Sequence, residues 1–175
     1  CYNKSFISSF GINASNLEGY LYPDTYLLLK NYTEEDIIRV MVSQFLYNYN
    51  ENILKNELTM HEIVTLASII QWEAMYDDEM RLISSVYHNR LDRNMLLQAD
   101  PTVQYVLPER KSKLLKKHTR VDNSYNTYLY KGLPPGPINS PGIMAIIAAA
   151  DPDQSDYLYF VANNKGRHIF NTTFK

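Results

Sequence analysis

Cysteine, long apolar runs and excess charge are all scarce in this sequence of 175 residues. Its only cysteine is Cys1, so no disulfide can form within the chain. It contains no apolar run of about 18 residues or more and no charged-then-apolar leader, so we expect the chain as given neither to cross a membrane nor to direct its own export. The formal net charge of -2 does not favour a nucleic-acid partner.

Motifs of metal and nucleotide chemistry are missing as well. His61 and Glu62 begin the helical zinc-protease pattern, but Thr65 stands where the second histidine would be needed. The sequence has neither a Gly-x-Ser-x-Gly motif nor a glycine loop for phosphate. We therefore expect no metal site and no cofactor.

A single carboxylate at the end of an apolar helix is the most informative feature that is present. Thr59 and Glu62 have the spacing of a capping box, and apolar residues follow at helical period: Ile63, Val64, Leu66, Ala67 and Ile70. Glu73 lies one turn beyond this stripe. A carboxyl group held among apolar side chains has a raised pKa, which suits a general acid. The alternative is a solvated glutamate at a helix end.

A second carboxylate follows four residues later. If the helix continues past Met75 and Tyr76, Asp77 lies close enough to repel a charged Glu73 and to raise its pKa further.

Other segments predict a mainly helical α+β domain with a small β-hairpin. We expect helices from residue 33, over 77–91 and over 143–150, the last capped by Ser140 with Pro141 in its first turn. Residues 98–139 are expected to be irregular, although Asp100-Pro101-Thr102 could also begin a helix. Strands over 157–162 and 167–171, joined by the turn 163–166, form the hairpin.

Long strings along the chain resemble, in the same order, those of the endolytic murein transglycosylase family (MltG, YceG-like). The resemblance runs from about Asn16 to Thr173 and rests on NLEGYLYPDTY (16–26), ASIIQWEA (67–74), YHNRL (87–91), LQADPTVQY (97–105), YNTY (125–128), GLPPGPI (132–138), SPG (140–142), DYLYFVA (156–162) and GRHIF (166–170). Glu73 matches the catalytic glutamate of the family. Gln71 replaces a usual glutamate, but residues two apart on a helix do not share a face, so Glu73 should remain functional.

The resemblance implies a lysozyme-like fold and an activity. Glu73 would protonate the bond between N-acetylmuramic acid and N-acetylglucosamine, then accept the proton of the muramyl 6-hydroxyl as an anhydro ring closes. We expect residues 1–175 to be a single catalytic domain, with a membrane anchor and a small preceding domain absent. The substrate would be peptidoglycan glycan strands at the extracytoplasmic face of the bacterial cytoplasmic membrane. Cell-wall synthesis proteins would be partners.

Further polar residues are candidates for substrate contacts. Gln98, Asn126, Thr127 and Tyr128 lie in the segment expected to be irregular, where they could hold sugar hydroxyl and N-acetyl groups. Asn126 and Thr127 could equally satisfy loop backbone. Glu18 is a further candidate for substrate contact, and in the family pattern it is expected to support the site or the fold. His168 is expected to be structural.

Two alternatives to the lytic transglycosylase stay open. If Glu18 lies across a cleft from Glu73, the pair could act as a two-carboxylate muramidase, which hydrolyses the same bond. The chain could also be a non-catalytic peptidoglycan-binding module. The muramidase would leave reducing ends, and the binding module would leave the strands intact.

A basic stretch runs from Arg110 to Arg120 and includes four lysines. It could meet anionic peptide stems of peptidoglycan or lipid head groups. A solvated loop or helix face is the alternative.

Overall fold

The computed structural model describes residues 3–53, 57–163 and 165–174. Its elements are α1 (Lys4–Ser8), α2 (Glu34–Asn52), α3 (Met60–Glu73), the 3-10 turn η1 (Asp77–Glu79), α4 (Met80–Asp92), α5 (Asp100–Val106), the 3-10 turn η2 (His118–Arg120), α6 (Ile143–Ala150), β1 (Tyr159–Ala162) and β2 (His168–Asn171). The predicted α+β composition is confirmed. Over those residues no helix has both the length and the apolarity to cross a bilayer.

Capping boxes begin both α2 and α3. At α3 the Thr59 hydroxyl accepts a hydrogen bond from the Glu62 backbone, and the Glu62 carboxylate accepts one from the Thr59 backbone, as predicted. At α2, Thr33 and Asp36 form the same arrangement. Each box satisfies amide groups that a helix N-terminus otherwise leaves unpaired.

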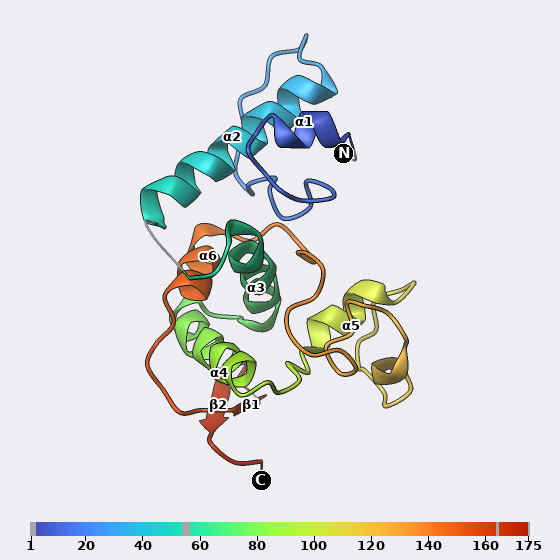
Figure 1. Ribbon diagram of the computed structural model, residues 1–175, viewed down its shortest axis with the longest axis vertical. Coiled ribbons are helices and arrows are strands. Elements are labelled where there is room, and N and C mark those ends of the chain that lie inside the picture. Colours follow the sequence, from blue (N-terminus) through green and yellow to red (C-terminus); the bar gives the residue numbers. More distant parts are fainter. Residues whose placement is uncertain (1–2, 54–56, 164, 175) are drawn as a thin grey trace.

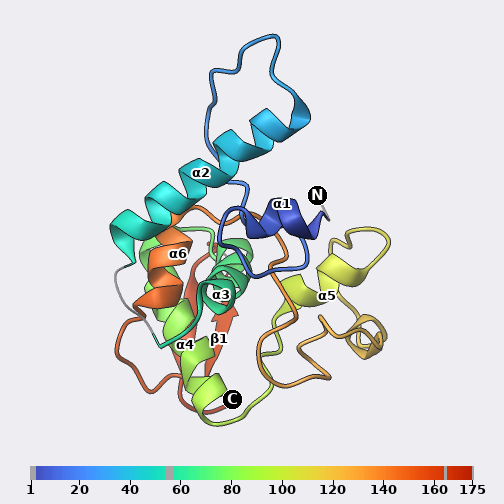
Figure 2. The ribbon, with the colours of Figure 1, turned by 45° about the horizontal axis from the view of Figure 1, so that its top comes forward.

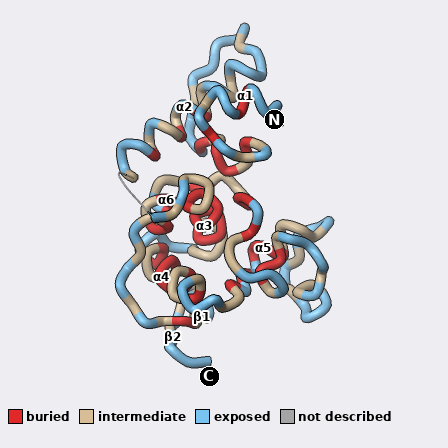
Figure 3. Tube along the Cα trace, viewed as in Figure 1, coloured by how far each residue is buried: buried red, intermediate tan, exposed pale blue. Residues whose placement is uncertain are grey.

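Helix α3 lies at the centre of the molecule (Figure 1). Residues 63–70 are all buried, because α4, α5 and α6 pack around this helix. Figure 3 shows the same concentration of buried residues along α3. The central helix is therefore a fixed support for whatever its C-terminus carries.

The remaining elements surround this support. Helices α1 and α2 form a layer on one side of it, and the loop before α2 projects beyond that layer (Figure 2). The β-hairpin lies on the opposite side, next to α4 (Figure 1). Its antiparallel register pairs Tyr159 with Asn171 and Ala162 with His168.

Several boundaries differ from the sequence expectations. The helix expected over 77–91 begins as η1 and becomes α-helical only at Met80. The N-cap of α6 is Gly142 rather than Ser140, and α5 lies inside the segment expected to be irregular. Asp100 is the first residue of α5, and Ala99 is its N-cap. The strands are shorter than expected, and Asn164 of the predicted turn lies outside the described residues.

Candidate active site

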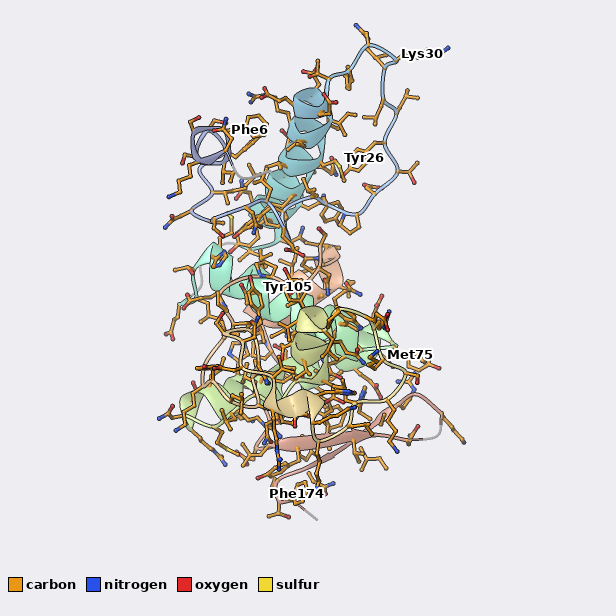
Figure 4. All side chains as sticks on the ribbon, turned by 90° about the vertical axis from the view of Figure 1, so that its right-hand side faces the viewer. Phe6, Tyr26, Lys30, Met75, Tyr105 and Phe174 are labelled. Carbon is orange, nitrogen blue, oxygen red and sulfur yellow. The ribbon has the colours of Figure 1, made fainter. Side chains whose placement is uncertain are left out.

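Glu73 is the last residue of α3, and its side chain enters a hollow of about 290 Å³. The hollow is lined by Glu73, Tyr87, Arg90, Leu97, Gln98, Asp100, Tyr128, Phe160, Val161, Ala162 and His168. These residues come from α3, α4, the start of α5, the loop near 128 and the hairpin. Figure 4 faces α5 and shows the hairpin running beneath it. The hollow therefore lies where the C-terminal end of α3 meets the hairpin and the loop segment.

The pKa of Glu73 is raised to about 7. Burial is the largest cause, because the charged carboxylate loses hydration that the neutral acid needs less. The negative charge of Asp100 raises the pKa further. The Tyr87 hydroxyl donates a 3.3 Å hydrogen bond to Oε1 and acts in the opposite direction. Near neutral pH, Glu73 can both donate and accept a proton.

Asp100, and not Asp77, is the neighbouring carboxylate that raises this pKa. Helix α3 ends at Glu73 and the backbone becomes extended at Ala74, so Asp77 is not one helical turn away. Asp100 lies in the same hollow and accepts a hydrogen bond from the Tyr128 hydroxyl. Burial and this carboxylate raise the pKa of Tyr128, which therefore keeps its proton. Sequence reasoning missed Asp100 as a site residue, although the string LQADPTVQY contained it.

Gln98 and Tyr128, both predicted substrate-binding residues, line the hollow. Gln98 has a positive φ of 50°, and its backbone amide donates to the Thr127 carbonyl at 3.0 Å. Another hollow, of about 240 Å³, shares Gln98 and Tyr128 with the first and extends along the hairpin to Phe174. Substrate contact by these two side chains stays a prediction that this placement favours.

Asn126 and Thr127 are buried and do not line the hollow. The Asn126 amide donates to the carbonyls of Thr119 and Val121, and its oxygen accepts from the Tyr128 backbone. The Thr127 hydroxyl accepts from the Ala99 backbone. For both residues this geometry favours the alternative interpretation, that they satisfy loop backbone.

Arg90, which sequence reasoning did not single out, joins three parts of the site. Its buried guanidinium donates from Nε to the Leu158 carbonyl at 2.7 Å and from Nη1 to the Leu97 carbonyl at 2.6 Å. It therefore fixes the start of the hairpin and the turn at Gln98 to α4. A buried positive charge needs such acceptors, since it is otherwise costly to desolvate.

Glu18 is not brought together with Glu73. It lines a different hollow with Asn16, Leu17, Leu21 and Ile38, and its carboxylate accepts a 2.7 Å hydrogen bond from the Tyr105 hydroxyl. The facing pair that a Glu18-dependent muramidase requires is absent from the hollow at Glu73. Glu18 is therefore placed to support the fold.

Gln71 and His168 have structural contacts. The Gln71 side-chain oxygen accepts a 3.0 Å hydrogen bond from the Gly142 amide at the start of α6, so Gln71 faces α6 rather than the hollow. His168 lines the hollow, but both its backbone amide and its ring nitrogen Nδ1 contact the Glu79 carboxylate. Over the described ranges no cluster of three or more His, Cys, Asp or Glu side chains is arranged to hold a metal ion.

Comparison with known proteins identifies the family. The chain matches the model of the YceG-like family over residues 3–175. It is 42% identical over 163 residues to an endolytic murein transglycosylase of Bacillus subtilis, covering 91% of this chain and 45% of the relative. It is 35% identical over 155 residues to one of Streptococcus pneumoniae, covering 84% of this chain and 28% of the relative. The chain thus spans less than half the length of these relatives.

A solved structure shows the same architecture. The crystal structure of a YceG-like protein from Listeria monocytogenes superposes with a TM-score of 0.86 at 40% identity, covering 98% of this chain and 62% of that one. The family match, the relatives and the shared fold all cover the segment that carries Glu73. This chain belongs to the YceG-like family.

Proposed function

We propose that this chain is the catalytic domain of an endolytic murein transglycosylase, which cuts peptidoglycan glycan strands between N-acetylmuramic acid and N-acetylglucosamine. The relatives carry that name, and the match covers nearly all of this chain. The observation that carries the proposal is a single carboxyl group, Glu73, whose pKa of about 7 lets it act as acid and then as base.

The chemistry requires two proton transfers at one group. Glu73 donates its proton to the glycosidic oxygen as the bond to C1 breaks, and positive charge develops at the sugar ring. The resulting carboxylate removes the proton of the muramyl 6-hydroxyl, whose oxygen bonds to C1. Glu73 ends protonated, the product carries a 1,6-anhydromuramic end, and no water is consumed.

Helices that surround a partly desolvated acid, with a small hairpin beside them, support a lysozyme-like fold as part of this proposal. The relatives are longer than this chain. As part of the proposal, the whole protein would be anchored at the extracytoplasmic face of the membrane, where it would work with cell-wall synthesis proteins. In that setting the enzyme would end or trim nascent strands.

The test compares this chain with its Glu73→Gln and Glu18→Gln variants on uncrosslinked glycan strands. We expect anhydromuramyl ends from the unmodified chain and from Glu18→Gln, and a loss of about 10²–10⁴-fold in rate for Glu73→Gln, the range for general acid–base catalysis. Mass spectrometry of the products provides the measurement.

The products also separate the alternatives. Reducing muramic ends would show hydrolysis and favour a muramidase. Strands that bind but stay intact would favour a peptidoglycan-binding module. Cleavage at the unmodified rate by Glu73→Gln would dispose of the proposed mechanism.

A further inference from the structure

The basic stretch from Arg110 to Arg120 divides into two parts in the structure. Arg110 and Lys111 line a hollow of about 310 Å³, whereas Lys113, Lys116 and Lys117 do not. The other lining residues are Trp72, Glu73, Asp100, Pro101, Gln104 and Ser112. Only Glu73 and Asp100 also line the hollow described above. The two carboxylates therefore stand on the boundary between two hollows.

The segment with both cations is fixed to α5. The Gln104 side chain donates from Nε2 to the Lys111 carbonyl at 2.7 Å, and its Oε1 accepts from the Lys111 amide at 2.9 Å. This pair of hydrogen bonds holds the backbone of the segment beside the hollow. The backbone at Lys111 therefore has a defined position relative to α5.

Arg110 is oriented by an aromatic ring. Its guanidinium lies 5.0 Å from the ring centroid of Trp72, the residue immediately before Glu73. Within the described part of the chain, Arg110 forms no ion pair. Lys111 pairs with Glu109, whose carboxylate is largely exposed, and such a surface pair is weak. Both cations are therefore available to an anionic ligand.

The two hollows differ in chemistry. Tyr87, Tyr128 and Phe160 contribute rings to the first hollow, where Arg90 is occupied by backbone carbonyls. Aromatic rings have flat apolar faces on which neutral sugar rings can pack. The hollow at Arg110 and Lys111 has one aromatic wall, Trp72, and two cations. An anion there would lie at the Arg110 and Lys111 side, away from Asp100.

On the basis of the proposed function, we propose that the hollow walled by Trp72, Arg110 and Lys111 binds the peptide stem of a muramyl residue next to the scissile bond. In an uncrosslinked strand the sugar backbone is neutral, and the carboxylates belong to the stems. A stem carboxylate would pair with Arg110 and Lys111 while the sugar ring lies against the boundary at Glu73. This site distinguishes peptide-bearing strands from bare glycan.

The test measures equilibrium binding in the Glu73→Gln background, so that strands stay intact. One preparation carries its stems, and the other is the same material after an amidase has removed them, which leaves a lactyl carboxylate on each muramyl residue, so that a loss confined to the first preparation reports the stem and not merely a negative charge. The variant is Arg110→Gln with Lys111→Gln. The matched control is Lys113→Gln with Lys116→Gln, which removes the same charge from the same basic stretch outside the hollow.

We expect the Arg110 and Lys111 variant to bind peptide-bearing strands about five- to tenfold more weakly, since two exposed charge pairs contribute modestly. Bare glycan should bind it as it binds the parent, and the control should bind both preparations as the parent does. Added salt should reduce the difference. Arg110 is exposed and Lys111 is half-buried, so neither substitution removes a core side chain, and a thermal melt of each variant checks that it stays folded.

Three outcomes would overturn the proposal: unchanged binding of peptide-bearing strands, an equal loss on bare glycan, or an equal loss in the control. Binding to vesicles of anionic lipid is measured with the same variants. If the Arg110 and Lys111 variant lost binding only to these vesicles, the proposal would be overturned in favour of a lipid head-group site. Because the assay needs no cleavage, it is independent of the product analysis that tests the transglycosylase activity. A selective loss with no activity in the unmodified chain would keep the peptide site and reject the proposed function.

Discussion

The two walls of the hollow at Glu73 are built in different ways. The helical wall presents Glu73 from α3 and Tyr87 from α4, and both helices are held by apolar packing against α6. The loop wall presents Gln98, Asp100 and Tyr128, next to Leu97 and Ala99, which are buried in the core. The helical wall is positioned by burial, whereas the loop wall is positioned by burial at Leu97 and Ala99 together with side-chain hydrogen bonds to its backbone.

The hydrogen bonds of the loop wall converge on a few buried polar side chains. Asn126 fixes the backbone around 119–128, Thr127 fixes the start of α5, and Arg90 fixes the turn at Gln98. A buried polar group contributes only when it is paired, so each of these contacts is needed.

The two walls contribute to the pKa of Glu73 in different ways. Burial is the largest cause of the raised pKa of Glu73, the loop wall adds the charge of Asp100, and Tyr87 in the helical wall acts in the opposite direction through its hydrogen bond. The acid Glu73 and the charge of Asp100, which raises its pKa, thus lie on different elements. Each can be changed by a separate substitution.

The largest expected effect on stability is for Asn126→Ala in the loop wall. It leaves the carbonyls of Thr119 and Val121 and the Tyr128 amide without this partner, which should cost about 2–3 kcal/mol of unfolding free energy. Asn123→Ala, which removes an exposed loop hydrogen bond to the Tyr125 amide, is the control and should cost less than about 1 kcal/mol. Denaturant unfolding measures both. A rise in KM without a loss of stability would instead make Asn126 a substrate contact.

The helical wall was largely predictable from sequence. The capping box at Thr59 and Glu62 and the apolar stripe after it fixed the start and the buried faces of α3, and the periodicity placed Glu73 at its end. These signals are local, and residues a few positions apart determine them.

The loop wall was predictable as motifs but not as contacts. The partners Asp100 and Tyr128 are 28 residues apart, and Arg90 reaches Leu158 across 68. No period or cap in the sequence indicates such pairs, so the sequence could offer only Asp77 as a neighbour of Glu73, on the condition that the helix continued past Tyr76, and the helix ends at Glu73. For the same reason Asn126 could not be assigned to substrate or to backbone until its partners were seen.

The second prediction concerns stability and pH in the helical wall. The pKa of Glu73 is raised from 4.5 to about 7 on folding, so between these values the folded chain binds more protons than the unfolded chain. Wild-type stability therefore falls as pH rises through this window. Glu73→Gln lacks this loss and should be more stable at pH 8, on the order of 1–3 kcal/mol, with no gain at pH 4. Thermal melts across pH test this, and a gain that persists unchanged at pH 4 would contradict it.

The third prediction adjusts the acid from the loop wall. Asp100→Asn removes the negative charge that raises the pKa of Glu73, so the carboxyl should ionise at lower pH. The alkaline limb of the kcat/KM profile should therefore move to lower pH. Asp122→Asn is the control, because Asp122 also accepts from a tyrosine hydroxyl, that of Tyr130, but lies outside the hollow. An unmoved limb for Asp100→Asn would leave burial as the sole cause of the raised pKa.

The smallest effect is expected from Tyr87→Phe, which adjusts the same acid from the helical wall in the opposite direction. The Tyr87 hydroxyl donates to Glu73 and favours its charged form, so removing it should raise the pKa and move the alkaline limb to higher pH. The phenyl ring keeps the packing against Phe160, and we expect a stability change of about 1 kcal/mol or less. Opposite shifts for Tyr87→Phe and Asp100→Asn would show that the two walls act on one proton. If both variants moved the alkaline limb in the same direction, each substitution would have changed the position of both walls. Neither wall would then change the pKa of Glu73 independently of the other.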